Sequence, residues 1–278
     1  MTHIVKDKRS IIMFNKVKTL HNYKLLSLDG EIGSVKDFYF DDKNWTIRHL
    51  IADTGNWLTG RQVLISPYAL KTVNKNERHI AVNLTKKQIE ESPSLDADKP
   101  VSQQFEMSYY EYYGWPIYWC GSYMWGDFPS ITHNPKDWKM SDEAKKRWDL
   151  NLRSTHEVSG YNVKAKDGEI GHIEDFIIDD ETWAIRYLII DTQNWWPGKK
   201  VLLSPKWINR VSWGESKAFI DLPRETIKQA PEYTNGALLS REYEKQLHHH
   251  YNRQGYWVDE TAINEHPLGA GMESPRKG

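Results

Sequence analysis

Hydrophobic and polar residues alternate along several short stretches of the chain, and this pattern predicts β-strands. Phe38 and Phe40 alternate with Asp37, Tyr39 and Asp41, so one face of this strand is apolar and the other mostly polar. The stretch 46–52 is apolar at almost every position, which is typical of a central strand covered on both faces. Together, the strands predicted at residues 25–28, 32–40, 46–52, 62–65 and 78–83 indicate a small closed or half-closed antiparallel barrel.

Turn and cap residues lie between these strands. Asp29-Gly30 separates the first two strands and predicts a two-residue hairpin, because such a turn needs positive φ angles. Ser66-Pro67 predicts a short helical turn, since serine caps a helix and proline fits its first position. Thr85, with a glutamine three residues later, predicts a capping box at the start of a short helix.

The same pattern recurs 138 residues later in the chain. Asp29-Gly-Glu-Ile-Gly33 recurs as Asp167-Gly-Glu-Ile-Gly171, and 23 of the 39 positions from 29 to 67 are identical without a gap. Beyond the barrels, Ser102 and Ser240 each open a segment with large residues at helical spacing. A repeat of this length and identity indicates a duplicated domain.

The repeated residues resemble those of the PRC-barrel domain. The resemblance rests on D-G-E-I-G, then D-F-x-x-D-D, then W-x-I-R-x-L-I-x-D-T, then G-x-x-V-L-x-S-P, each of which occurs twice. That domain forms the cytoplasmic barrel of the photosynthetic reaction-centre H subunit and the C-terminal domain of a bacterial ribosome maturation factor. The resemblance implies a binding or assembly module without common catalytic residues.

We therefore expect a mainly β protein with two small antiparallel PRC-type barrels related by internal duplication, each with short C-terminal helices. The expected divisions are an N-terminal segment (1–19), a first barrel (20–93), a helical, aromatic-rich connector (94–157), a second barrel (158–231), and a C-terminal helix with a mobile tail (232–278). The tail from about Glu260 is rich in glycine and proline and poor in large apolar residues, so it cannot offset its ordering entropy.

Composition excludes several classes of protein. The 278 residues carry a net charge of −1, which argues against a large basic face for direct binding of nucleic acid. One cysteine excludes a disulfide framework and a cysteine-based zinc site. Lysines and arginines interrupt the apolar residues near the N-terminus, so we expect neither a signal peptide nor a transmembrane segment, and a cytoplasmic location.

The repeated carboxylates suggest metal binding or acid–base chemistry, but turns explain them more simply. Within the central strands, Arg48 with Asp53, and Arg186 with Asp191, are predicted to form structural ion pairs, because a buried arginine needs a partner. The sequence contains no phosphate loop, nucleophile elbow or zinc-binding helix motif. We therefore predict no enzyme activity, no catalytic residue, no cofactor and no metal site.

Aromatic residues are the remaining unusual feature. The chain has 13 tryptophans and 15 tyrosines, and the stretch 105–128 holds eleven aromatics with no lysine or arginine. Stacking on single-stranded nucleic acid needs nearby cations, which this stretch lacks. The remaining choices are a core between the barrels or a surface for a partner, and packing between the barrels is favoured because aromatic patches this large are rarely left exposed. The candidate interface residues are Tyr39, Trp57, Tyr109, Tyr112, Trp115, Trp119, Trp125, Ile177, Trp195 and Trp196. We predict that 109–125 is buried between two barrels related by a pseudo-two-fold axis.

The sequence thus favours a non-catalytic interaction or assembly module whose partner is another protein. By analogy with the H subunit, it could dock on a membrane-associated electron-transfer complex. One alternative is an RNA-processing or ribosome-assembly factor that acts through a ribosomal protein. The other is a small-ligand binder or enzyme that uses the cleft between the barrels.

Overall fold

The computed structural model describes residues 14–59, 61–96, 101–115, 117–118, 152–192, 199–234 and 239–258. The first half contains β1 (Phe14–Lys16), α1 (Val17–Leu20), β2 (Lys24–Ser27), β3 (Gly30–Asp41), β4 (Thr46–Asp53), β5 (Arg61–Ile65), β6 (Leu70–Asn74), β7 (His79–Val82), α2 (Lys86–Glu90), β8 (Leu95–Asp96) and α3 (Gln103–Tyr113). The second half contains β9 (Leu152–Ser154), α4 (Thr155–Val158), β10 (Asn162–Ala165), β11 (Gly168–Asp179), β12 (Ile185–Asp191), β13 (Lys200–Leu203), β14 (Ile208–Ser212), β15 (Lys217–Ile220), α5 (Arg224–Lys228) and α6 (Arg241–His250). None of these described helices is long and apolar enough to cross a membrane.

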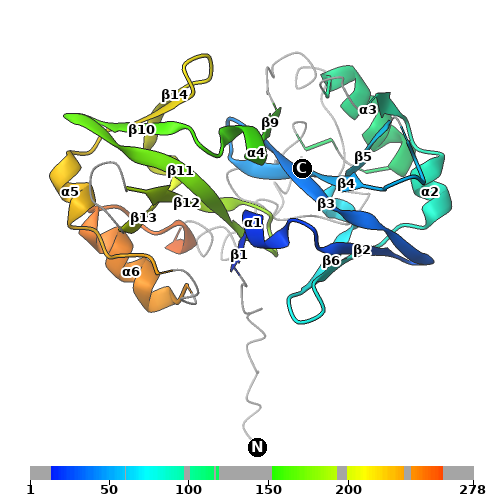
Figure 1. The fold of residues 1–278 in the computed structure, drawn as a ribbon, viewed down its shortest axis with the longest axis horizontal. Helices are drawn as coiled ribbons and strands as arrows, with labels where there is room; N and C mark the ends of the chain where they lie inside the picture. Colours follow the sequence, from blue (N-terminus) through cyan, green and yellow to red (C-terminus); the bar gives the residue numbers. More distant parts are fainter. Residues whose placement is uncertain are drawn as a thin grey trace, which may run out of the picture.

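Each half forms one curled sheet, and the two half-barrels lie side by side (Figure 1). The strand order is β6-β7-β2-β3-β4-β5-β8 in the first sheet and β13-β12-β11-β10-β15-β14 in the second. The prediction of a mainly β protein with two duplicated barrels is confirmed. The antiparallel order is interrupted in each sheet, because β2 pairs with β7 and β10 with β15 in parallel.

The local sequence explains the long central hairpin of each barrel. Phe38 and Phe40 are fully buried on the apolar face of β3, as their alternation predicts. The preceding turn is shifted by one residue, because Ser27 pairs with Gly30, which has a φ of 136° and begins β3. Gly33 is required for a different reason: a Cβ there would collide with the backbone of Asp53 on β4.

The two halves exchange their first strands. β1 precedes the first barrel in the sequence but pairs with β11 of the second, and β9 precedes the second barrel but pairs with β3 of the first. Asp37 and Asp175 secure the exchange. Asp37 accepts hydrogen bonds from the Ser154 and Thr155 hydroxyls (2.5 and 2.9 Å), and Asp175 accepts one from the backbone N–H of Lys18 (3.1 Å). The barrels are therefore interlocked by backbone pairing.

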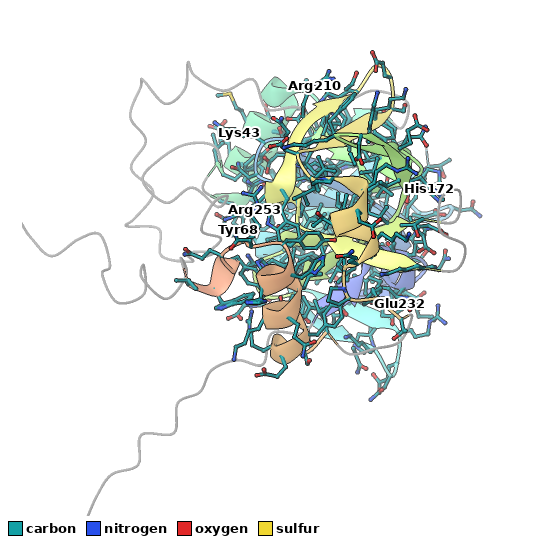
Figure 2. The ribbon with its side chains drawn as sticks, turned by 90° about the vertical axis from the view of Figure 1, so that its left-hand side faces the viewer. Lys43, Tyr68, His172, Arg210, Glu232 and Arg253 are labelled. Carbon is teal, nitrogen blue, oxygen red and sulfur yellow. The ribbon has the colours of Figure 1, made fainter. Side chains whose placement is uncertain are left out.

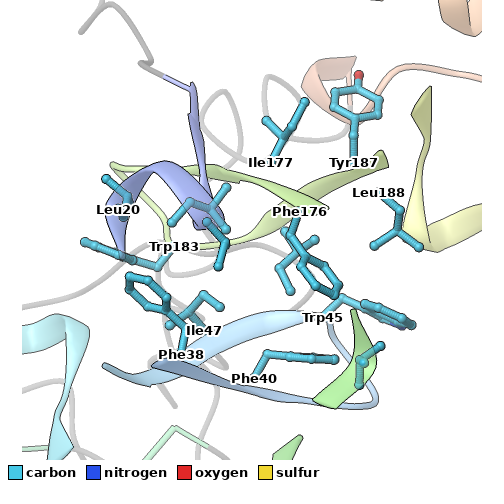
Figure 3. Packing of buried hydrophobic residues seen from close by; sticks show 14 of the residues in the cluster. Leu20, Phe38, Phe40, Trp45, Ile47, Phe176, Ile177, Trp183, Tyr187 and Leu188 are labelled. Carbon is cyan, nitrogen blue, oxygen red and sulfur yellow. The ribbon is translucent and has the colours of Figure 1, made fainter. Parts of the chain in front are cut away.

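Aromatic side chains from both sheets fill the seam between the barrels (Figure 3). Phe40 lies 5.1 Å from Trp45 and 6.0 Å from Phe176, and Phe38 lies 6.2 Å from Trp183, measured between ring centroids. The backbone also crosses the seam, since the N–H of Ile47 donates to the carbonyl of Trp183 at 2.9 Å. The seam is thus a hydrophobic core shared by the two repeats.

The sequence analysis placed this seam on the wrong strand face. Ile177 points away from Phe176 and the other seam residues (Figure 3), because successive side chains on a strand point to opposite sides. Tyr39 is the counterpart of Ile177 and pairs across the strands with His49, on the face that α3 covers. Trp57 follows β4, at the opposite end of that strand from Trp45. The side chains of Tyr39 and Ile177 therefore do not fill the seam, although the backbones of both residues pair with the exchanged strands β9 and β1.

Candidate functional site

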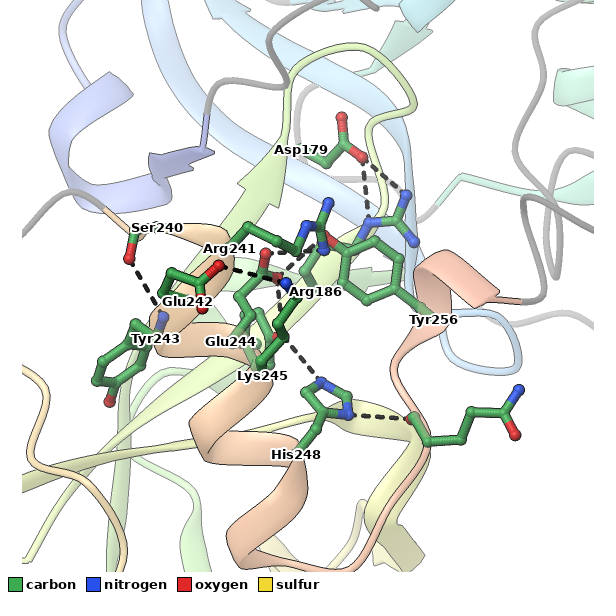
Figure 4. A network of polar contacts seen from close by, with 12 residues as sticks. Asp179, Arg186, Ser240, Arg241, Glu242, Tyr243, Glu244, Lys245, His248 and Tyr256 are labelled. Carbon is green, nitrogen blue, oxygen red and sulfur yellow. Dashed lines mark hydrogen bonds and ion pairs between the residues drawn. The ribbon is translucent and has the colours of Figure 1, made fainter.

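A buried polar network joins α6 to the second barrel (Figure 4). The Tyr187 and Tyr256 hydroxyls both donate to Glu244 Oε1, at 2.9 and 3.0 Å, and Arg241 pairs with Glu244 Oε2 at 2.9 Å. His248 Nε2 lies 3.0 Å from the Tyr187 hydroxyl, and its Nδ1 lies 3.0 Å from a backbone carbonyl. The carboxylate of Glu244 is therefore held by a cation and two phenols.

Next to this network, Arg186 forms a second buried arrangement. Its Nε and Nη2 donate to Asp179 Oδ2 at 3.1 and 2.7 Å, and its guanidinium lies 4.0 Å from the centroid of the Tyr256 ring. Asp179 Oδ1 accepts from the backbone N–H groups of residues 181 and 182. One carboxylate thus closes the turn and neutralises the arginine.

The first barrel contains the equivalent arrangement. Arg48 donates to Asp41 Oδ2 at 2.7 Å and lies 4.2 Å from the centroid of the Tyr118 ring. Glu106 Oε1 accepts from the Tyr118 hydroxyl at 3.0 Å and lies 2.9 Å from His49 Nε2. The side chains of Arg48, Asp41 and His49 are completely buried.

Comparison of the repeats at the 138-residue offset shows that histidine and tyrosine have exchanged places. His49 on β4 corresponds to Tyr187 on β12, whereas Tyr110 on α3 corresponds to His248 on α6. In both halves the two rings meet edge to face with centroids 6.0 Å apart. Each half therefore keeps one histidine and one tyrosine in ring contact, but on opposite elements, and in each half the strand residue, His49 or Tyr187, contacts the buried glutamate.

Burial determines the ionisation of these groups. It raises the pKa of the Glu244 carboxyl, while Arg241 lowers it, and it raises the pKa of Tyr187 well above its usual value. Burial also lowers the pKa of the His248 imidazole. The Glu244 side chain is fully buried, and its contacts with Tyr187 join α6 to the second barrel.

The structure corrects the predicted ion pairs. Arg48 pairs with Asp41 and not with Asp53, which is exposed, and Arg186 pairs with Asp179 and not with Asp191. The physical reason is strand geometry. Residues five positions apart on one strand lie on opposite faces and about 17 Å apart. The actual partners lie across a hairpin turn, seven positions away in the sequence.

The described part of the predicted aromatic strip packs on the first barrel. The Tyr109 hydroxyl donates to the Leu64 carbonyl at 2.9 Å, and Trp115 stacks on Tyr113 and on Tyr68, whose pKa burial raises to about 12. Tyr109, Tyr110 and Tyr118 are buried, as predicted, but strand side chains fill the seam, so the predicted place of the strip between the barrels is wrong for these residues. Trp119, Trp125, Trp195 and Trp196 lie outside the described residues, as does the predicted mobile tail.

Sequence reasoning missed Glu106, Glu244, Tyr118 and His248. A single glutamate on an amphipathic helix is usually exposed, so nothing in its immediate surroundings marks it. The signal was the repeat itself: at the same offset Glu106 matches Glu244 and Tyr118 matches Tyr256. Following the repeat beyond the barrels would have identified these pairs.

A pocket of about 350 Å³ lies between the barrels. The turn that contains Lys43 forms one wall, and the opposite wall comes from Lys206 and from Arg210 and Val211 on β14. Lys43 and Arg210 lie on the same side of the molecule in Figure 2. Within the described residues, no group of three or more His, Cys, Asp or Glu side chains could hold a metal ion.

The family model for the PRC-barrel domain matches two segments, residues 16–89 and 151–227, which together make up more than half of the chain. The chain belongs to the PRC-barrel family. No curated protein matches the sequence. The second matched segment begins just before β9, and the first begins at the end of β1, so the exchanged strands lie at equivalent edges of the two PRC barrels.

Proposed function

We propose that this tandem PRC-barrel protein is a non-catalytic assembly module that binds another protein through a surface of its first barrel. This surface, the α2 patch, consists of Leu28, Trp57 and Tyr112, which all adjoin the region around α2. The Leu28 N–H donates to the Leu84 carbonyl, and the Tyr112 hydroxyl donates to the Gln88 carbonyl. Lys86 on α2 lies 6.0 Å from the Trp57 ring.

Asymmetry between the repeats is the observation that carries the proposal. In the first half, Leu28, Met107 and Tyr112 are 66, 42 and 40% exposed. Their counterparts at the 138-residue offset are Lys166, Lys245 and His250. The second barrel folds with charged or polar residues at these positions, so the fold does not require exposed hydrophobic side chains there. Exposed apolar and aromatic residues are typical of protein-binding surfaces.

The buried networks support a role without catalysis. Their carboxylates, hydroxyls and imidazoles contact one another and hold α3 and α6 on the barrels, and the side chains of Arg48 and Asp41 are inaccessible. A rigid pair of barrels suits a docking platform, because little conformational entropy is lost on binding. Family resemblance suggests two partner classes: a membrane-associated electron-transfer complex and a ribosomal protein.

The test replaces Leu28 and Tyr112 of the α2 patch with the residues of the second repeat and leaves Trp57, which matches Trp195 there. A partner captured from source cells is identified, purified and titrated against the wild type and the Leu28→Lys/Tyr112→His variant. We expect binding to weaken by at least tenfold, as for residues at the centre of an interface. The control is Val258→Lys, which changes an exposed hydrophobic residue outside the patch.

Two outcomes contradict the proposal. Equal binding of the partner to the variant and the wild type shows that the α2 patch is not the docking surface. If the purified protein turns over a substrate and Glu106→Gln or Glu244→Gln abolishes turnover while the folding transition is preserved, the protein is an enzyme and the networks are its active sites.

A further inference from the structure

The pocket between the barrels carries more positive than negative charge. Lys43, Lys206 and Arg210 line it, together with Arg186, whereas Asp42 is its one lining carboxylate among the described residues. Asp42 is paired with Arg153 at 3.3 Å, and Arg186 with Asp179 at 2.7 Å. No ion pair joins Lys206 or Arg210 to a carboxylate in the described part of the chain.

The duplication shows that the fold does not need these cations. At the 138-residue offset, Lys43 corresponds to Glu181 in the second repeat. Lys206 and Arg210 correspond to Tyr68 and Thr72 in the first repeat. The same turn and the same strand form in both halves. The first repeat carries two lysines nearby, Lys71 and Lys75, at the positions of Asn209 and Trp213 in the second repeat. Lys75 Nζ donates to the Phe14 carbonyl at 3.0 Å.

The other lining groups indicate the rest of the ligand. Ile208, Val211 and Trp213 are only partly buried and give the pocket an apolar wall, while Asn44 adds an amide. Pockets of this size are within the range that holds small molecules, with a few polar groups that fix the orientation. An anion in this pocket is attracted by the positive charges of Lys206 and Arg210.

We propose that this pocket binds a small organic phosphate, with the phosphate held by Lys43, Lys206 and Arg210 and the apolar body against Ile208, Val211 and Trp213. Three cations match a dianionic phosphate better than a singly charged carboxylate. This site lies on the second barrel and the first-barrel turn, away from the α2 patch, so it is independent of the proposed docking of a protein.

The experiment uses phenyl phosphate as the probe, measured by titration calorimetry on the full-length protein. Two matched probes are phenol, which lacks the charged phosphate, and inorganic phosphate, which lacks the ring. We expect saturable binding of phenyl phosphate at one site, and binding of each matched probe at least about tenfold weaker. Phenol loses the charge-assisted hydrogen bonds and inorganic phosphate loses the burial of the ring, and each loss is worth roughly that factor.

Variants locate the site. Lys206→Gln/Arg210→Gln should weaken binding by at least about tenfold, whereas Lys71→Gln, which removes an exposed cation from the equivalent strand β6, should leave it unchanged. Arg210→Thr introduces the residue of the first repeat and provides a second variant compatible with the fold. Absence of saturable binding overturns the proposal. So does equal weakening by Lys71→Gln, which would show attraction to surface charge in general.

Discussion

Asp41 and Asp179 show how one side chain can perform two structural tasks. In the first repeat, Asp41 Oδ1 accepts the Asn44 N–H at 2.6 Å, and Oδ2 accepts from Arg48 at 2.7 Å. The preference of aspartate for turns accounts for the first contact but not for the second. The second contact could not be predicted from sequence spacing, because the hairpin reverses the chain between Asp41 and Arg48 and so brings the two side chains together. Each repeated aspartate therefore compensates a buried cation as well as closing a turn.

We predict that Asp41→Asn lowers the free energy of unfolding by about 3–5 kcal/mol, because it leaves the buried Arg48 without its counter-ion. The amide oxygen can still accept the turn hydrogen bond, so the loss reports the ion pair. Asp179→Asn should act in the same direction on the second barrel. Denaturant-induced unfolding measures both effects.

Asp53→Asn is the matched control for Asp41→Asn, because it makes the same chemical change at an exposed position. Asp53 is exposed, and its Oδ1 accepts the Gly55 N–H at 3.0 Å, which an amide oxygen can also do. We expect a change within about 0.5 kcal/mol. If Asp53→Asn proved as destabilising as Asp41→Asn, the assignment of Asp41 as the partner of Arg48 would be wrong.

At the level of elements, the structure attaches one helix to each barrel through a glutamate, a histidine and a tyrosine. The first repeat places the histidine on the strand and the second places it on the helix. Residues that contact each other in a buried polar network are energetically coupled, because a donor left without its acceptor must be desolvated at a cost. Because histidine and tyrosine have changed places between the repeats, we infer that the fold needs the histidine–tyrosine pair and not a particular residue on the strand or the helix.

Exchanging the second pair tests this coupling. We predict that His248→Tyr and Tyr187→His each destabilise the protein, and that the double variant, which reproduces the arrangement of His49 and Tyr110, recovers part of the loss. The interaction energy should fall in the range of about 0.5–3 kcal/mol. A double-mutant cycle from unfolding curves measures it, and strictly additive effects would contradict the coupling.

The pH dependence provides an independent measurement on His248→Tyr. Burial lowers the pKa of His248, so the unfolded chain binds a proton more readily than the folded protein. The stability contributed by neutral His248 is therefore present above the ordinary histidine pKa of about 6.5 and is lost as the pH falls below it. We expect His248→Tyr to reduce the loss of stability below this pH. An unchanged slope would show that other groups cause it.

Elements with strong local patterns could be predicted from the sequence, and elements specified by distant contacts could not. The alternation at Phe38 and Phe40 and the capping box at Thr85 lie within short windows, and the structure has both. β1 and β9 are three residues long and pair with strands more than a hundred residues away, so no periodicity marks them. Among the predicted interface residues of α3, Tyr109 is buried whereas Tyr112 is exposed, and the buried Tyr110 was not among them.

For the whole molecule, the exchange of first strands means that neither half contains all of its own sheet. A fragment that spans residues 139–278 would carry β9 without β3 to receive it, and its β11 would lack β1. An exposed strand edge of this kind favours pairing with another chain. The counterpart of Asp37 is Asp175, so a second copy of the fragment offers the carboxylate that Ser154 and Thr155 bind in the intact protein.

We therefore predict that the isolated fragment 139–278 forms a homodimer in which two copies of β9 are exchanged about a two-fold axis. The seam would lack the ring of Phe40, because Ile178 occupies the equivalent position, so the dimer should be less stable than the intact protein. Light scattering coupled to size-exclusion chromatography gives the mass of the fragment. Deletion of residues 152–154 should abolish the dimer, whereas Lys245→Gln, an exposed change on α6, should not. A monomeric fragment that unfolds cooperatively would show that a single repeat completes its own core and that strand exchange is dispensable.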